Sequence, residues 1–379
     1  YGTNTAIRYA RIANPYLRFE TSQKLDVGLD VGLFENRLLL GVDYFNNNID
    51  NLILASPTAP SLGVPSSQIN RNIGAMYNRG FEFGINTMNI TREEFNWSTS
   101  FNITFLKNRV QRLAEGQPIN YLYHTVREGE AIGSFYGYVD RGVNSANGNP
   151  LFEKADGTVV QRAFGNNGAW SVYNPENPAD ESQITTGLSI DDKRILGLSN
   201  PTWYGGFNNN FRYKRFDANV FFTFSGGNKV YNRTRQESLN QQGFAGAGRE
   251  LLDRWTTPGQ ITDVPQLYFN SDTYALQAGN LNSRFLENGT FLRAQNLAIG
   301  YTLKPILLSR IHVSNFRVFA QIQNAFVITA YKGLDPELSN INSGNFLSND
   351  VQVSNVQSGL DFSASPIPRT YTFGLNIGF

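Results

Sequence analysis

Few side chains in this 379-residue chain belong to the types that usually carry out catalysis or bind transition metals. The sequence contains two histidines, His124 and His312, and no cysteine. Neither histidine has a cysteine or a second histidine nearby that could complete a zinc site or a nucleophile–base pair. We therefore expect no catalytic residue, no bound metal and no cofactor, so the chain is not expected to be an enzyme.

Paired carboxylates are the remaining candidates for acid–base chemistry. Asp26 and Asp30 fall on one face of an alternating segment, where they could act as a general acid and a general base. Glu82 and Asp217 occupy similar polar positions. We favour a second interpretation, in which these carboxylates line a wet channel and are solvated or ion-paired.

The composition excludes several classes of protein. The formal net charge is +1, so there is no basic excess that would suggest a nucleic-acid partner. The absence of cysteine excludes disulfide bonds. There is no run of about 18 apolar residues that would form a membrane-spanning helix. The chain opens without a signal peptide, so we expect either a processed precursor or a start that lies upstream.

Long segments alternate apolar and polar residues with a period of two, which is typical of β-strands with two different faces. Segment 369–379 is the clearest, with Tyr371, Phe373, Leu375, Ile377 and Phe379 alternating with small or polar residues. We predict nine strands in all, at residues 22–34, 38–44, 78–88, 95–105, 203–213, 216–224, 291–303, 315–328 and 369–379.

The connections between these strands alternate between short and long. The short connections are 35–36, 89–94, 214–215 and 304–314, and the long ones are 54–75, 107–198, 230–288 and 329–368. A soluble β-sandwich also has one apolar and one polar face. The alternation of loop lengths and the aromatic residues near strand ends instead favour an all-β fold, an antiparallel transmembrane β-barrel with tight periplasmic turns and long external loops.

Strand direction follows from the same pattern. If residue 379 ends in the periplasm, the first predicted strand also runs inward, so residues 1–21 begin outside. Bacterial barrels have an even number of strands and no open edge facing lipid. We therefore expect residues 1–379 to be the C-terminal part of a barrel domain whose other strands lie upstream or on another chain.

Eight stretches of the chain match a known pattern: NPYLRFETSQKLDVGLDVGLFENRLLLGVDYF at 14–45, NIGAMYNRGFEFGIN at 72–86, FNWSTSFNITFLKNRV at 95–110, GSFYGYV at 133–139, segment 200–232, FLENGTFLRAQNLAIGYTL at 285–303, RVFAQIQNAFVITAYKGLDPE at 317–337 and PRTYTFGLNIGF at 368–379. In these stretches the chain resembles the SusC/RagA-type TonB-dependent transporters of Gram-negative outer membranes.

The resemblance implies a 22-stranded barrel in the outer membrane, with an N-terminal plug and early strands that precede residue 1. It also implies a SusD-like surface lipoprotein on the external loops, TonB-derived energy for uptake, and oligosaccharide or peptide substrates. Members of the family often carry an Asp/Asn/Gly-rich loop before the Asn-Pro that matches Asn200-Pro201. This chain has only Asp191-Asp192 there, so we expect no calcium site.

The external loops are the predicted functional surface, because aromatic faces and amide groups suit both sugars and peptides. The substrate-contacting candidates are Tyr121, Tyr123, Trp170, Tyr173, Trp255, Tyr268, Tyr274 and Tyr331. These residues could instead pack the loops together or against the lipoprotein. Tyr371, Phe373, Leu375, Ile377 and Phe379 are expected to face lipid and to act as an assembly signal. Two alternatives stay open: a passive outer-membrane channel, and a surface β-rich binding protein.

Overall fold

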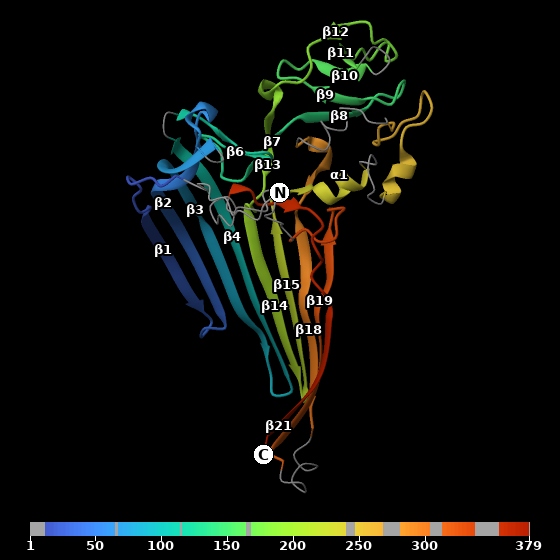
Figure 1. The fold of residues 1–379 in the computed structure, drawn as a ribbon. Helices are drawn as coiled ribbons and strands as arrows, with labels where there is room; N and C mark the ends of the chain where they lie inside the picture. Colours follow the sequence, from blue (N-terminus) through green and yellow to red (C-terminus); the bar gives the residue numbers. More distant parts are fainter. Residues whose placement is uncertain are drawn as a thin grey trace, which may run out of the picture.

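A computed structural model describes residues 12–64, 67–113, 116–163, 168–239, 247–267, 281–303, 313–337 and 356–378. Its main feature is a nine-stranded antiparallel sheet, here called the wall, whose strands lie in chain order (Figure 1). The strands are β1 (Thr21–Leu33), β2 (Leu38–Pro57), β3 (Gln68–Thr91), β4 (Phe95–Leu113), β14 (Trp203–Tyr213), β15 (Phe216–Gly226), β18 (Phe291–Thr302), β19 (Asn315–Thr329) and β21 (Thr370–Gly378).

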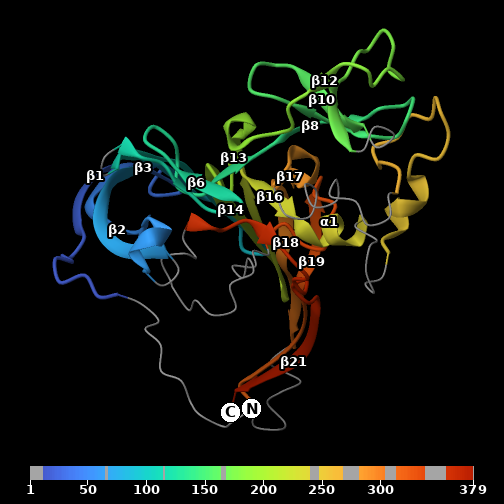
Figure 2. The same cartoon turned by 45° about the horizontal axis from the view of Figure 1, so that its top comes forward.

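All nine predicted strands are present, and each of them belongs to the wall. The sheet curves without closing, as the tilted view in Figure 2 shows. Tight turns join β1 to β2, β3 to β4 and β14 to β15 at its lower end. The β1–β2 turn places Phe34, Glu35 and Asn36 at positive φ, and the β14–β15 turn does the same with Lys214. The predicted antiparallel all-β architecture is therefore confirmed.

The prediction was wrong about where β2, β3 and β4 end. Residues 54–75 were expected to form a long loop, but Leu54 pairs with Arg71, and the connection spans only residues 58–67. It contains the 3₁₀ turn η1 (Pro60–Leu62). The upper parts of these strands pack against other loops and bury Leu52 and Val110. Burial by protein removes the contrast between a lipid-facing and a polar face, so the alternation that marks a strand disappears.

The three remaining long connections form what we call the loop module: the described residues between β4 and β14, between β15 and β18, and between β19 and β21. It lies above the wall (Figure 1). One small sheet has the order β12 (Ile184–Thr185), β11 (Ala169–Val172), β10 (Val159–Ala163), β9 (Pro150–Glu153) and β8 (Val139–Val143). A second has the order β13 (Arg194–Leu198), β7 (Ser134–Gly137), β6 (His124–Val126) and β5 (Ile119–Asn120). A third has the order β17 (Leu286–Asn288), β16 (Lys229–Asn232) and β20 (Leu360–Asp361).

The elements of the loop module are short. The helical elements are η4 (Ile190–Asp192), α1 (Arg233–Leu239), η5 (Arg249–Asp253) and η6 (Ser283–Phe285). None of these helices has the apolar length that a bilayer span requires, among the residues the structure describes.

The packed core lies in the loop module and at its junction with the wall. Its largest cluster joins Tyr123 and Phe135 from the first long connection, Tyr231 and Phe285 from the second, and Leu360 from the third. Each fully buried side chain of this size contributes about 1.5–3 kcal/mol through burial. The three connections are therefore held together as one folded unit.

Candidate functional site

The wall presents one face of apolar side chains, here called the apolar face. Pairing between strands aligns these side chains in rows. One row contains Val27, Tyr44, Phe81, Phe105 and Trp203. A lower row contains Phe95, Tyr213, Phe216, Tyr301, Val318 and Leu375. A contiguous apolar surface of this extent marks a contact with membrane or protein.

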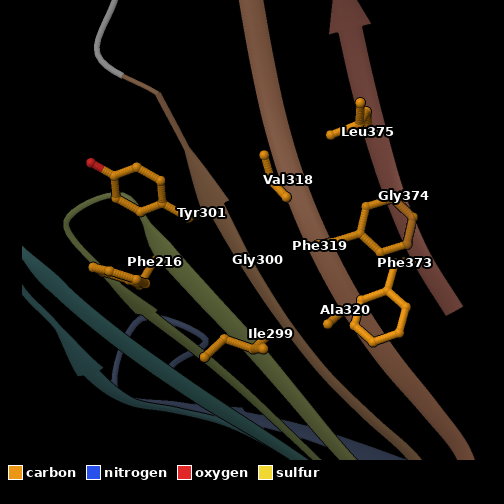
Figure 3. Close-up of a pocket in the computed structure, with 10 residues that line it drawn as sticks. All are labelled: Phe216, Ile299, Gly300, Tyr301, Val318, Phe319, Ala320, Phe373, Gly374 and Leu375. Carbon is orange, nitrogen blue, oxygen red and sulfur yellow. The ribbon is translucent and has the colours of Figure 1, made fainter. Parts of the chain in front are cut away.

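The closing strand β21 continues the apolar face. Phe373 is 81% exposed, and Tyr371, Leu375 and Ile377 are also exposed. Side chains from β15, β18, β19 and β21 line a shallow groove of about 430 Å³, shown in Figure 3. Phe216 of β15 and Tyr301 of β18 lie 4.6 Å apart between ring centroids at one edge of the groove. The four side chains of the expected stripe that the structure describes lie on the apolar face, and Phe379 lies outside the described residues.

The opposite, polar face carries hydrogen-bonding groups. Asn219 donates to Asn208 at 2.7 Å and to Asn210 at 2.9 Å, and Asn296 donates to Asn219 at 2.8 Å. These amides form a continuous ladder across three strands. Such a surface suits water and polar solutes, because amide groups offer both hydrogen-bond donors and acceptors.

The carboxylates of the polar face are ion-paired or open to solvent, as the second interpretation expected. Asp217 accepts from the Arg317 guanidinium, with Nε 2.9 Å from Oδ1. Asp26 and Asp30 are exposed, and Glu82 has only a long 3.5 Å hydrogen bond from Thr104. No described group of three or more His, Cys, Asp or Glu side chains is arranged to hold a metal ion.

Buried ion pairs anchor the loop module to the wall. Arg293 of β18 lies 2.6 Å from Asp335 and also binds Glu337, with the Arg293 and Asp335 side chains each 3% exposed. Breaking such a pair from one side leaves an uncompensated buried charge. Sequence analysis missed this site. The available signal was Arg293, a cation at a predicted strand end, together with two carboxylates in the following loop.

Further charge pairs hold the loop module together internally. Arg284 lies 2.9 Å from Asp140, and both side chains are buried. Glu153 binds both Arg194 and Arg141, and these hydrogen bonds hold the pKa of Glu153 below its ordinary value. The loop module is therefore fixed by directional contacts as well as by apolar packing.

His124 is fully buried in β6 and faces the Phe135 ring at 4.6 Å between centroids. Its Nε2–H donates to the Ser358 carbonyl at 2.9 Å. Burial lowers the pKa of His124 from 6.5 to about 4, so the ring is neutral at pH 7. The side chain therefore links the first long connection to the third. His312 lies outside the described residues.

The aromatic candidates divide into two groups. Tyr123 and Tyr331 are buried, with Tyr123 packed on Tyr231 at 5.3 Å between centroids and the Tyr331 hydroxyl donating to Asp361 at 2.5 Å. Burial raises the pKa of Tyr331. Neither ring offers a free face to a ligand, so packing accounts for both. Tyr268 and Tyr274 lie outside the described residues.

Four candidates keep part of their surface exposed: Tyr121, Trp170, Tyr173 and Trp255. Trp170 makes an edge-on contact with Phe152 at 6.4 Å between centroids. The Trp255 indole N–H donates to the Ser145 carbonyl at 2.8 Å. These anchors fix the two tryptophans while leaving part of each ring accessible.

The Asp192 carboxylate forms its hydrogen bonds with neighbouring groups of the same chain. One carboxylate oxygen accepts from the Ala155 N–H at 3.0 Å, and the other accepts from the Ser189 N–H at 2.7 Å and its hydroxyl at 3.0 Å. These hydrogen bonds lower the pKa of Asp192 against the opposing effect of burial. The carboxylate caps η4 and fixes the turn before β13.

Comparisons with known proteins agree with this geometry. A family model described as "TonB dependent receptor-like, beta-barrel" matches residues 1–138. "TonB-dependent receptor P3" of Formosa agariphila is 36% identical over 377 residues, covering 97% of this chain and 35% of that protein. "TonB-dependent receptor SusC" of Bacteroides thetaiotaomicron is 27% identical and covers 97% of this chain and 32% of that protein. The chain thus spans about a third of the curated relatives it matches.

A solved structure described as the "RagAB peptide transporter" shares the fold, with a TM-score of 0.76, 23% identity, and coverage of 97% of this chain and 36% of that chain. The wall and its matches resemble the β-barrel domain of TonB-dependent receptors, which are outer-membrane proteins. Among such receptors, the chain is similar to SusC of Bacteroides thetaiotaomicron and shares its fold with the RagAB structure. In outer-membrane barrels an apolar face of this kind contacts lipid, and the polar face lines the lumen.

Proposed function

We propose that the chain forms part of the pore of an active outer-membrane importer of nutrient oligomers, either glycans or peptides. The observation that carries this proposal is the division of the wall into a lipid-facing apolar face and a polar face bearing the Asn219 amide ladder. We further propose that residues 1–379 are the C-terminal part of the barrel and that the loop module faces the exterior. Transport then needs no covalent chemistry.

In this proposal, substrate is captured at the loop module beneath a SusD-like lipoprotein and above a plug encoded upstream. Energy from TonB opens the passage along the polar face. The name SusC among the relatives and the RagAB fold match support a two-component importer. RagAB is described as a peptide transporter, whereas aromatic and amide groups in this chain suit glycans as well.

The decisive experiment measures uptake of labelled oligosaccharide and peptide mixtures by cells that make the full-length receptor and its cognate lipoprotein. We expect uptake that disappears when TonB is deleted. Equal uptake without TonB would instead support a passive channel. The labelled pool that accumulates identifies the substrate as glycan or peptide.

A second experiment tests the partly exposed aromatic residues. Trp170→Ala and Trp255→Ala should each weaken substrate binding roughly 2- to 10-fold, because an aromatic stacking contact contributes about 0.5–1.5 kcal/mol beyond area burial. Tyr331→Phe is the matched control, since Tyr331 is buried. Unchanged affinity in both tryptophan variants would contradict a substrate role for these rings.

Exposed apolar side chains of the loop module mark a candidate docking site for the lipoprotein. Ile261 is 94% exposed and Leu252 is 74% exposed. We propose that both become covered by the lipoprotein. The Leu252→Asp/Ile261→Asp variant should lose co-purification of the lipoprotein, while Leu62→Asp in the β2–β3 connection should retain it. Retention by the double variant would refute this docking site.

A further inference from the structure

The apolar stripe of β3 and β4 ends in two cations at the end nearest the loop module. Arg79 precedes Phe81 by two residues in β3, and Lys107 follows Phe105 by two residues in β4. Because side chains two apart share a face, both cations lie on the apolar face. Arg79 and Lys107 are direct cross-strand partners, and both are exposed.

A cross-strand pair of like charges is destabilising unless an anion lies nearby. Within the described residues, neither Arg79 nor Lys107 forms an ion pair with a carboxylate. The Arg79 guanidinium stacks on Tyr77 at 4.4 Å from the ring centroid, which fixes its plane. Glu130 lines the adjoining groove with Lys107 and Arg109, and the neighbouring Arg112 pairs with Asp50. The two cations therefore have room for an external anion.

An aromatic groove lies directly below the cations. Tyr44, Phe81, Phe105 and Trp203, together with Arg79 and Lys107, line a groove of about 530 Å³. Tyrosine and tryptophan collect at the headgroup level of a bilayer. Arg79 and Lys107 lie two residues beyond Phe81 and Phe105, towards the loop module. This position places both cations at the depth of the lipid phosphates.

We propose that Arg79 and Lys107 bind the phosphate of a phosphorylated lipid of the outer leaflet, whose acyl chains lie along the aromatic groove. A lipid is the favoured source of the phosphate because the site continues the lipid-facing surface, and the charges are complementary. Guanidinium and ammonium groups are the usual protein partners of phosphate. The leaflet assignment rests on the proposed function, which places the loop module outside.

The test uses the full-length receptor in detergent and measures bound lipid A by native mass spectrometry. Each cation near an anionic lipid surface is worth about a five-fold change in affinity. The Arg79→Gln/Lys107→Gln variant should therefore lose lipid A retention about ten-fold or more. Lys24→Gln/Arg212→Gln removes the same charge from exposed positions on the polar face and should behave like wild type.

Three arms make the outcome decisive. The charge-preserving variant Arg79→Lys/Lys107→Arg should retain lipid A, which separates loss of charge from failure to fold. Dephosphorylated lipid A should bind wild type as weakly as phosphorylated lipid A binds the double glutamine variant. Millimolar inorganic phosphate should not displace lipid A.

The proposal would be overturned if the Arg79→Gln/Lys107→Gln variant retained as much lipid A as wild type does. It would also be overturned if wild type bound dephosphorylated and phosphorylated lipid A equally well. Displacement by inorganic phosphate would show a free-anion site instead. Lipid retention does not depend on transport, so this result stands apart from the test of TonB-dependent uptake.

Discussion

The wall and the loop module place their apolar residues in opposite ways. Phe373 of the wall is 81% exposed, whereas Phe135 of the loop module is fully buried. The wall relies on an external apolar solvent and on its ladder of backbone hydrogen bonds. The loop module builds its own core, as a water-soluble domain does. The same residue type therefore reports membrane contact in one region and internal packing in the other.

The largest effect is expected when a core side chain is removed from the loop module, because this change should destabilise the loop module and leave the wall intact. Phe135→Ala should destabilise the loop module by about 3–5 kcal/mol, the usual loss for a buried phenylalanine. Hydrogen exchange of residues 134–137 measures it. Heat-modifiable migration on gels should remain, because the wall does not depend on this ring. Phe105→Ala on the apolar face is the control and should leave that exchange unchanged.

The next prediction uses pH. The folded-state pKa of His124, about 4, lies below the ordinary value of 6.5. Protonation therefore favours the unfolded loop module, and its stability should fall as pH drops from 6.5 towards 4. The full loss is about 3 kcal/mol. Hydrogen exchange of β6 and β7 at several pH values measures it. His124→Gln should flatten this dependence, and an unchanged slope would rule out His124 as its source.

A charge on the apolar face should have a similar or slightly smaller effect, confined to the wall. Phe373→Arg places a cation against lipid and should cost about 2–4 kcal/mol at the bilayer midplane. Equilibrium folding into lipid vesicles measures this free energy. Thr372→Arg, its neighbour on the polar face, should be nearly neutral. Equal losses in the two variants would contradict the assignment of the faces.

The smallest expected effect concerns the ion pair on the polar face. Asp217→Asn removes the partner of Arg317, but both side chains retain contact with solvent. The loss of stability in the same vesicle assay should stay below about 1 kcal/mol. A loss of several kcal/mol would mean that the polar face is less hydrated than a water-filled lumen.

The same contrast explains what could be predicted from the sequence. All nine wall strands were predictable, because lipid on one side and water on the other impose a period of two. The role of Asp217 as an ion-paired carboxylate followed from the same argument. The upper ends of β2 to β4 were missed because protein buries Leu52 and Val110 there, so the alternation fades.

The loop module could not be predicted for two physical reasons. Its strands are short, so they have no measurable period. Its contacts also join residues that are distant in sequence, such as Tyr231 with Leu360. Tyr123 and Tyr331 looked like ligand-stacking residues because exposed and buried tyrosines cannot be told apart without those contacts. Arg79 and Lys107 occupy positions that continue the period of two of the apolar stripe. A search for catalytic or metal-binding residue types does not detect this signal.

The parallel pairing of β16 with β20 also has a consequence for the order of assembly. Tyr231 and Leu360 meet only after β18, β19 and the final connection have been synthesised and placed. Contacts of such long range form late and slowly. The core of the loop module therefore closes only once the final connection has been placed above β18 and β19. Protease resistance of this core, followed over time, would report when that connection has docked.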